Sequence, residues 1–143
     1  MIELRDGKSV FSLRACGILL RHECVLVQRA KSGFILPGGR VELLEMSTQT
    51  IAREMWEELG VHVKLGGRGI TVERVFDYEK SHVHQVLFVY EMKTEETIDP
   101  ERMESEGMRW WPVETLDSLA LYPASVKSEI KEIYSKGKAE SEK

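Results

Sequence analysis

The sequence has little of what marks a secreted or membrane-bound protein. Its 143 residues include only two cysteines and four prolines, which excludes a disulfide-built scaffold and a proline-rich linker. No apolar run approaches the roughly 20 residues that cross a bilayer. The first ten residues, MIELRDGKSV, lack the apolar stretch of a signal peptide. We therefore expect a soluble, cytoplasmic protein without membrane contact.

Basic charge is also scarce. The formal net charge is −4, the pI is about 5.6, and no run of lysines and arginines occurs. A protein that grips a nucleic-acid backbone needs a basic patch, so we expect no long nucleic acid as partner. The length fits one domain, without internal repeats, over residues 1–135, followed by a frayed polar tail at 136–143.

The two cysteines lie in a predicted hairpin. Strands are expected at Leu13–Leu20 and Cys24–Arg29, joined by a short turn. In such a hairpin Cys16 lies opposite a residue near Gln28, too far along the ladder from Cys24 for a disulfide. We expect two free thiols in a reducing compartment.

The rest of the chain predicts a mixed sheet between helices. Gly66–Gly69 is interpreted as a flexible hairpin turn in preference to a phosphate loop, because no Lys-Ser/Thr and helix follow. A C-terminal helix is expected around Val126, Ile130 and Ile133. Further strands are expected at 61–65, 70–78, 83–92 and 108–113.

One helix is sharply defined, from Ser47 to Leu59. Ser47 is a suitable N-cap and Gly60 a stop signal. An apolar stripe recurs at helical spacing, with Ala52 and Trp56 beside its main members Ile51, Met55 and Leu59.

Three glutamates share another face of this helix: Glu54, Glu57 and Glu58. Their mutual repulsion, and their position near a helix C-terminus, are both unfavourable unless a cation offsets them. Mg²⁺ or Mn²⁺ prefers such oxygen ligands. Taken alone, the Glu57-Glu58 pair favours a solvated acidic surface over a cation site, because exposed charge clusters are ordinary.

The preceding residues favour the cation. Phe34-Ile35-Leu36 runs into Pro37-Gly38-Gly39, a turn whose backbone can approach a metal or phosphate. From Gly39 to Val61 the chain matches every fixed position of GX5EX7REUXEEXGU, where U is apolar. This pattern closely resembles the signature of the Nudix hydrolase family. Met55 and the pair Leu43-Leu44 replace residues more usual in that family.

The resemblance, over about residues 10–134, implies an α/β fold, the α/β/α Nudix sandwich with a mixed sheet. It implies a metal-dependent hydrolase that cleaves a diphosphate linkage in a nucleoside diphosphate linked to a group X. We expect Mg²⁺ or Mn²⁺ to be held by Glu57, Glu58 and the carbonyl of Gly38. Glu54 would be a third ligand or the base, and Arg53 would orient the glutamates through an ion pair with Glu45. A further metal ligand or base outside the signature would be Glu106 or Glu104.

Substrate contacts are predicted at Gly39, Arg40 and His84. For the pair His82-x-His84 we prefer contact with a substrate or partner over zinc, because no third soft ligand is nearby. Trp110 and Trp111 point to opposite faces of a strand, and core packing is preferred over base stacking.

The substrate is expected to be a small nucleotide, either ADP-ribose or a nucleotide sugar, or a (d)NTP. The alternative is a non-catalytic nucleotide-binding or sensing Nudix domain. A homodimer also stays open, with Met1–Ser12 as a segment that could pair with a neighbour.

Overall fold

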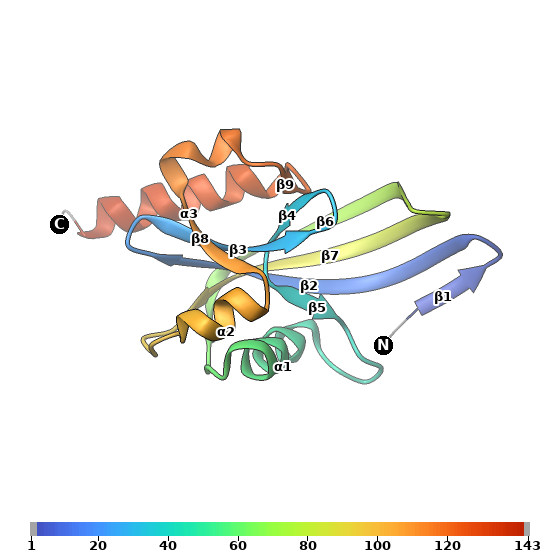
Figure 1. Cartoon of the computed structure of the whole chain (residues 1–143), viewed down its shortest axis with the longest axis horizontal. Helices are drawn as coiled ribbons and strands as arrows, with labels where there is room; N and C mark the ends of the chain where they lie inside the picture. Colours follow the sequence, from blue (N-terminus) through green and yellow to red (C-terminus); the bar gives the residue numbers. More distant parts are fainter. Residues whose placement is uncertain (1–2, 142–143) are drawn as a thin grey trace.

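The chain forms a twisted mixed sheet with helices on both faces (Figure 1). The computed structural model describes residues 3–141. Helices α1 (Ser47–Leu59) and α2 (Pro100–Ser105) lie on one face, and α3 (Val126–Ser141) lies on the other. This is the predicted α/β/α sandwich.

The sheet is built on three long strands, β2 (Ser9–Arg21), β6 (Lys64–Tyr78) and β7 (Ser81–Lys93). β7 pairs with β2 in parallel and with β6 antiparallel. A 3₁₀ segment, η1, covers Val113–Ser118. The shorter strands are β1 (Glu3–Asp6), β3 (Cys24–Ala30), β4 (Gly33–Ile35), β5 (Gly38–Arg40), β8 (Met108–Pro112) and β9 (Leu121–Tyr122).

Strand β2 changes partner along its length. Residues 14–16 pair with β5, whereas residues 20–21 pair with β3. The β4–β5 segment therefore leaves the β3 side of the sheet and returns beside the middle of β2. This places the Gly38-Gly39 backbone at the sheet, next to α1.

Two apolar cores hold the helices to the sheet. On the α3 face, Val126, Ile130 and Ile133 pack against Ile18 and Val27, among others. On the α1 face, the main residues are Ala15, Leu19, Leu26, Ile51, Met55, Leu59 and Met103. Each core seals one face, so α1 has a fixed position relative to β2 and β5.

The predicted cysteine hairpin is present at its turn, but the predicted partner of Cys16, near Gln28, is wrong. Cys16 lies opposite Gly38 and Val89, and Cys24 lies opposite Arg21. The β2–β3 ladder is short because β5 takes over as the partner of β2. Both thiols are nevertheless free, as expected, and Cys16 is buried.

Segment Gly66–Gly69 is part of a strand, not the predicted hairpin turn. β6 runs through it, with a register shift in its pairing with β7 between Leu65 and Gly69. The predicted strand at 61–65 accordingly begins only at Lys64. The glycines form a bulge in the strand, because residues 66–68 have no partner in β7 and pairing resumes at Gly69.

Both ends of the described chain are more ordered than the sequence suggested. Residues Glu3–Asp6 pair with β2 of the same chain. The sequence left open that Met1–Ser12 pairs with a neighbouring protein chain instead. Met1 and Ile2 lie outside the described residues. The predicted frayed tail is helical as far as Ser141, because lysine, alanine and glutamate favour a helix. Residues 142–143 lie outside the described range.

Within residues 3–141, no helix is long and apolar enough to cross a membrane.

Candidate functional site

Helix α1 has the predicted bounds and carries the glutamates to the sheet. Ile51, Met55 and Leu59 are buried against β2, and Gly60 ends the helix at φ 67°, a left-handed conformation that glycine adopts readily. The N-cap is Met46, not Ser47, whose hydroxyl instead bonds the Tyr90 hydroxyl at 2.7 Å. Trp56, predicted beside the apolar stripe, is 53% exposed.

The two glycines of β5 allow two close approaches, that of β5 to β2 at Gly38 and that of Glu54 of α1 to β5 at Gly39. A Cβ at Gly38 would collide with the backbone of Ala15, and a Cβ at Gly39 would collide with the carboxylate of Glu54. The Glu54 side chain therefore lies directly against the backbone of the Pro-Gly-Gly turn.

Arg53 is the centre of an ion-pair network. Its Nε donates to Glu45 Oε2 at 2.8 Å, and its Nη1 donates to Glu54 Oε1 at 2.9 Å and to Glu57 Oε2 at 3.3 Å. Its Nη2 donates to the carbonyl of Arg40 at 3.2 Å. The predicted Arg53–Glu45 pair is present, and Arg53 also ties the helix to β5.

The buried Thr50, which the sequence analysis did not select, completes the fixation of Glu45. Its hydroxyl donates to Glu45 Oε1 at 2.7 Å. The hydrogen bonds from Arg53 and Thr50 lower the pKa of Glu45, although partial burial opposes them. Glu45 is thus held as a carboxylate without any further ligand.

Glu58 has the opposite environment. Its Oε2 atom is buried and has no hydrogen-bond partner among the described residues. Burial, together with the neighbouring Glu54 carboxylate and the charge of Glu106, raises the pKa of Glu58 to about 8. A carboxyl group in such surroundings is neutral or has a cation beside it.

The two candidates outside the signature behave differently. Glu106, at the C-terminal end of α2, acts electrostatically on Glu58. Its carbonyl accepts a hydrogen bond from Gln28 at 2.9 Å, which fixes the chain there. Glu104 is exposed, and within residues 3–141 it makes no contact with the signature glutamates. The structure therefore brings Glu106, and not Glu104, to the site.

Of the predicted substrate contacts, only Gly39 lies with its backbone at the site, whereas the side chains of Arg40 and His84 point elsewhere. The Arg40 side chain extends to Glu3, with a distance of 2.8 Å between Nη1 and Oε2. His84 lies toward the far end of the β6–β7 hairpin, where its Nε2 contacts Glu73 Oε2 at 2.9 Å and its ring meets Phe11. The structure does not bring His84 to the glutamates.

A cation at this site requires side-chain movement. In the part of the chain that the structure describes, no three His, Cys, Asp or Glu side chains lie close enough together to hold a metal ion. His82 and His84 are therefore not part of such a group either. Three of the signature carboxylates point to Arg53. The fit of a divalent cation rests on Glu58, because its buried oxygen has no partner and is the hard ligand that Mg²⁺ or Mn²⁺ prefers once the carboxyl loses its proton.

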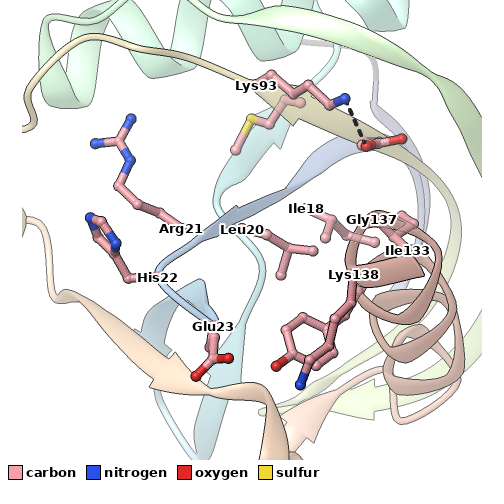
Figure 2. Close-up of a pocket in the computed structure, with 12 residues that line it drawn as sticks. Ile18, Leu20, Arg21, His22, Glu23, Lys93, Ile133, Gly137 and Lys138 are labelled. Carbon is pink, nitrogen blue, oxygen red and sulfur yellow. Dashed lines mark ion pairs between the residues drawn. The ribbon is translucent and has the colours of Figure 1, made fainter. Parts of the chain in front are cut away.

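Another hollow lies away from these residues, between the β2–β3 turn and α3. Its volume is about 430 Å³, and Figure 2 shows Arg21, His22 and Glu23 on one side and Ile133 and Lys138 of α3 on the other. None of the predicted site residues lines it. The hollow is therefore separate from the glutamate site.

Comparison with known proteins agrees with this geometry. The model of the NUDIX domain matches residues 11–133. A MutT-like protein of Streptomyces ambofaciens is 27% identical over 126 residues, which are 86% of this chain and 71% of that protein.

Solved structures share the fold. The MutT protein (family Nudix hydrolase) of methicillin-resistant Staphylococcus aureus matches with a TM-score of 0.65 and 23% identity, over 88% of this chain and 97% of that one. An Ap4A hydrolase of C. elegans matches with a TM-score of 0.60 and 13% identity, over 90% and 98% of the respective chains. Because the family model matches residues 11–133 and the signature has the expected geometry, the chain belongs to the Nudix family of hydrolases, which act on phosphorus anhydrides in nucleoside diphosphate derivatives.

Proposed function

We propose that this protein is a metal-dependent pyrophosphohydrolase of small nucleotides, with Glu57 and Glu58 as the principal ligands of Mg²⁺ or Mn²⁺. Nudix hydrolases generally use divalent metals. The observation that carries the proposal is the buried, unpartnered Oε2 of Glu58 beside Glu54. A divalent cation would remove the cost of that buried oxygen and of the glutamate repulsion.

The backbone of the Pro-Gly-Gly turn supports the same assignment. Gly38 and Gly39 have no side chains to keep a ligand away, and Glu54 already lies against Gly39. We assign the Gly38 carbonyl as an additional ligand.

The bound cation would supply positive charge that stabilises the leaving phosphate. Glu54, either a third ligand or the base, would take the proton from the attacking water. Arg53 keeps Glu45, Glu54 and Glu57 oriented through its guanidinium. Glu106 is the candidate for a further ligand or base, because its charge acts on Glu58.

The substrate is proposed to be a small nucleotide, either ADP-ribose or a nucleotide sugar, or a (d)NTP. A panel of these compounds, assayed for phosphate and pyrophosphate release with Mg²⁺, with Mn²⁺ and with EDTA, tests the function. Turnover that requires a divalent cation is expected. Tight nucleotide binding without turnover of any compound would favour a sensing domain instead.

A further inference from the structure

Arg14 is a charged residue in the middle of the central strand β2. It lies opposite Arg40 of β5 on one side and Leu87 of β7 on the other. Among the described residues, no hydrogen bond or ion pair of its guanidinium is found. Burial lowers its pKa, as does the charge of Arg40 to a smaller extent, whereas Cys16 and then the charges of Glu54 and Glu58 raise it. Arg14 is therefore close to the glutamate site but not satisfied by it.

A second arginine shares this face of the sheet. Arg74 of β6 lies opposite Gln85, which in turn lies opposite Ser12 of β2, so residues 12, 14, 74 and 85 point to the same side. Arg74 donates to Gln85 Oε1 at 3.3 Å and lies 4.2 Å from the centre of the Phe76 ring. Both of these partners are uncharged. Burial first, and then the charge of Arg14, lower the pKa of Arg74.

Two guanidinium groups that repel each other on a half-buried sheet face are unfavourable without an anion between or beside them. Glu54 and Glu58 act on Arg14 through their charge, but neither forms an ion pair with it among the described residues. Guanidinium groups are well suited to phosphate, because they offer several donors in a fixed plane.

We propose that Arg14 and Arg74 form a phosphate-binding face that holds a phosphate group lying beyond the hydrolysed linkage, so that the preferred substrate carries a chain of three or more phosphates. The proposal rests on the proposed function for the identity of the hydrolysed linkage. It selects nucleoside triphosphates or longer polyphosphates over ADP-ribose and nucleotide sugars, whose diphosphate has no further phosphate to place there.

Binding of inorganic tripolyphosphate and pyrophosphate, measured by calorimetry on metal-stripped protein in chelator-free buffer, tests the face without catalysis. The variants are Arg14→Gln and Arg74→Gln. Arg109→Gln is the matched control, because Arg109 is an exposed arginine of β8 that contacts Trp111. Tripolyphosphate is expected to bind at least about tenfold more tightly than pyrophosphate, and each variant is expected to lose roughly ten- to a hundredfold in tripolyphosphate affinity.

Two further measurements, of Tm and of KM, distinguish a loss of phosphate binding from a loss of folding. Neither variant should lower the Tm strongly, because Arg14 loses no hydrogen bond and Arg74 loses only one to a neutral amide. With Mg²⁺, Arg14→Gln should raise KM for ATP more than KM for ADP-ribose, with a smaller change in kcat.

Unchanged tripolyphosphate affinity in both variants, or equal loss in Arg109→Gln, would overturn the proposal. So would equal affinity of the unaltered protein for tripolyphosphate and pyrophosphate. Arginine-dependent binding in a protein that hydrolyses none of the nucleotides would overturn the proposed function while leaving the phosphate-binding face in place.

Discussion

The signature segment, which is helix α1 and the loop before it, carries two sets of carboxylates with opposite environments. Glu45, Glu54 and Glu57 all contact Arg53, and the pKa of Glu45 is lowered. Glu58 has a buried oxygen without a partner, and its pKa is raised to about 8. The first set is complete within the protein and fixes the geometry. The second is completed only by a ligand, which is where we place the cation.

The largest expected effect is that of Glu58→Gln on catalysis. If Glu58 binds the cation, its loss should lower kcat by about 10²- to 10⁴-fold, a range typical of removing a key electrostatic contact. The Tm of the metal-free variant should be equal or higher, because an unsatisfied buried oxygen is replaced by a neutral amide. Steady-state kinetics and thermal unfolding measure both.

Glu95→Gln is the control for this variant. Glu95 is exposed and outside the signature, so the substitution removes the same charge without touching the glutamate site. Near-normal turnover by Glu58→Gln in Mg²⁺ would contradict the ligand assignment.

Arg53→Gln should affect stability as well as activity. It leaves Glu45, Glu54 and Glu57 without their shared partner and removes the tie to the Arg40 carbonyl. We expect a loss of about 1–3 kcal/mol in the free energy of unfolding, together with a large loss of kcat. Urea unfolding followed by circular dichroism measures the first. Full stability with full activity would show that the two sets of carboxylates do not differ as described.

The third prediction concerns pH. A carboxyl whose pKa is higher in the folded than in the unfolded protein stabilises the fold fully below its unfolded pKa, and loses this effect as the pH rises through the folded value. For Glu58 that window runs from the usual 4.5 up to about 8. The Tm of the metal-free protein should therefore fall across this window relative to that of Glu58→Gln. Parallel Tm curves would contradict the raised pKa.

The smallest expected effect lies in the loop just before Glu45. Leu44 has φ 68° and is 96% exposed, so it adopts a left-handed conformation without burying its side chain. Leu44→Gly should relieve about 1–2 kcal/mol of strain and lose about 0.5–1 kcal/mol in chain entropy. A small rise in Tm is expected by differential scanning calorimetry, and a clear fall would show that Leu44 makes a contact of its own.

What the sequence predicts well is local. The bounds of α1, its stop at Gly60 and the Arg53–Glu45 pair all follow from spacing within one helix and its adjoining turn. Residues whose surroundings come from distant strands were missed. Arg14 is one example, because its burial depends on β2 lying between β5 and β7. An arginine inside an apolar strand was the signal that could have revealed it.

The errors have the same cause. Gly66–Gly69 has the composition of a turn, but it forms a bulge within β6, because the residues on both sides of 66–68 pair with β7. His84 has a chemically suitable side chain, but its position along β7 places it against Glu73, remote from the glutamates. The six-residue helix α2, which brings Glu106 to Glu58, is too short to show a helical period in the sequence.

The central claim is that a divalent cation completes the environment of Glu58. Titration of Mg²⁺ into the metal-free protein near neutral pH, by calorimetry in buffers of different ionisation enthalpy, measures affinity and released protons together. We predict binding with release of about one proton from the unaltered protein, because the cation displaces the proton of Glu58, and much weaker binding without that release from Glu58→Gln. Equal Mg²⁺ affinity and equal proton release in the two proteins would contradict the account.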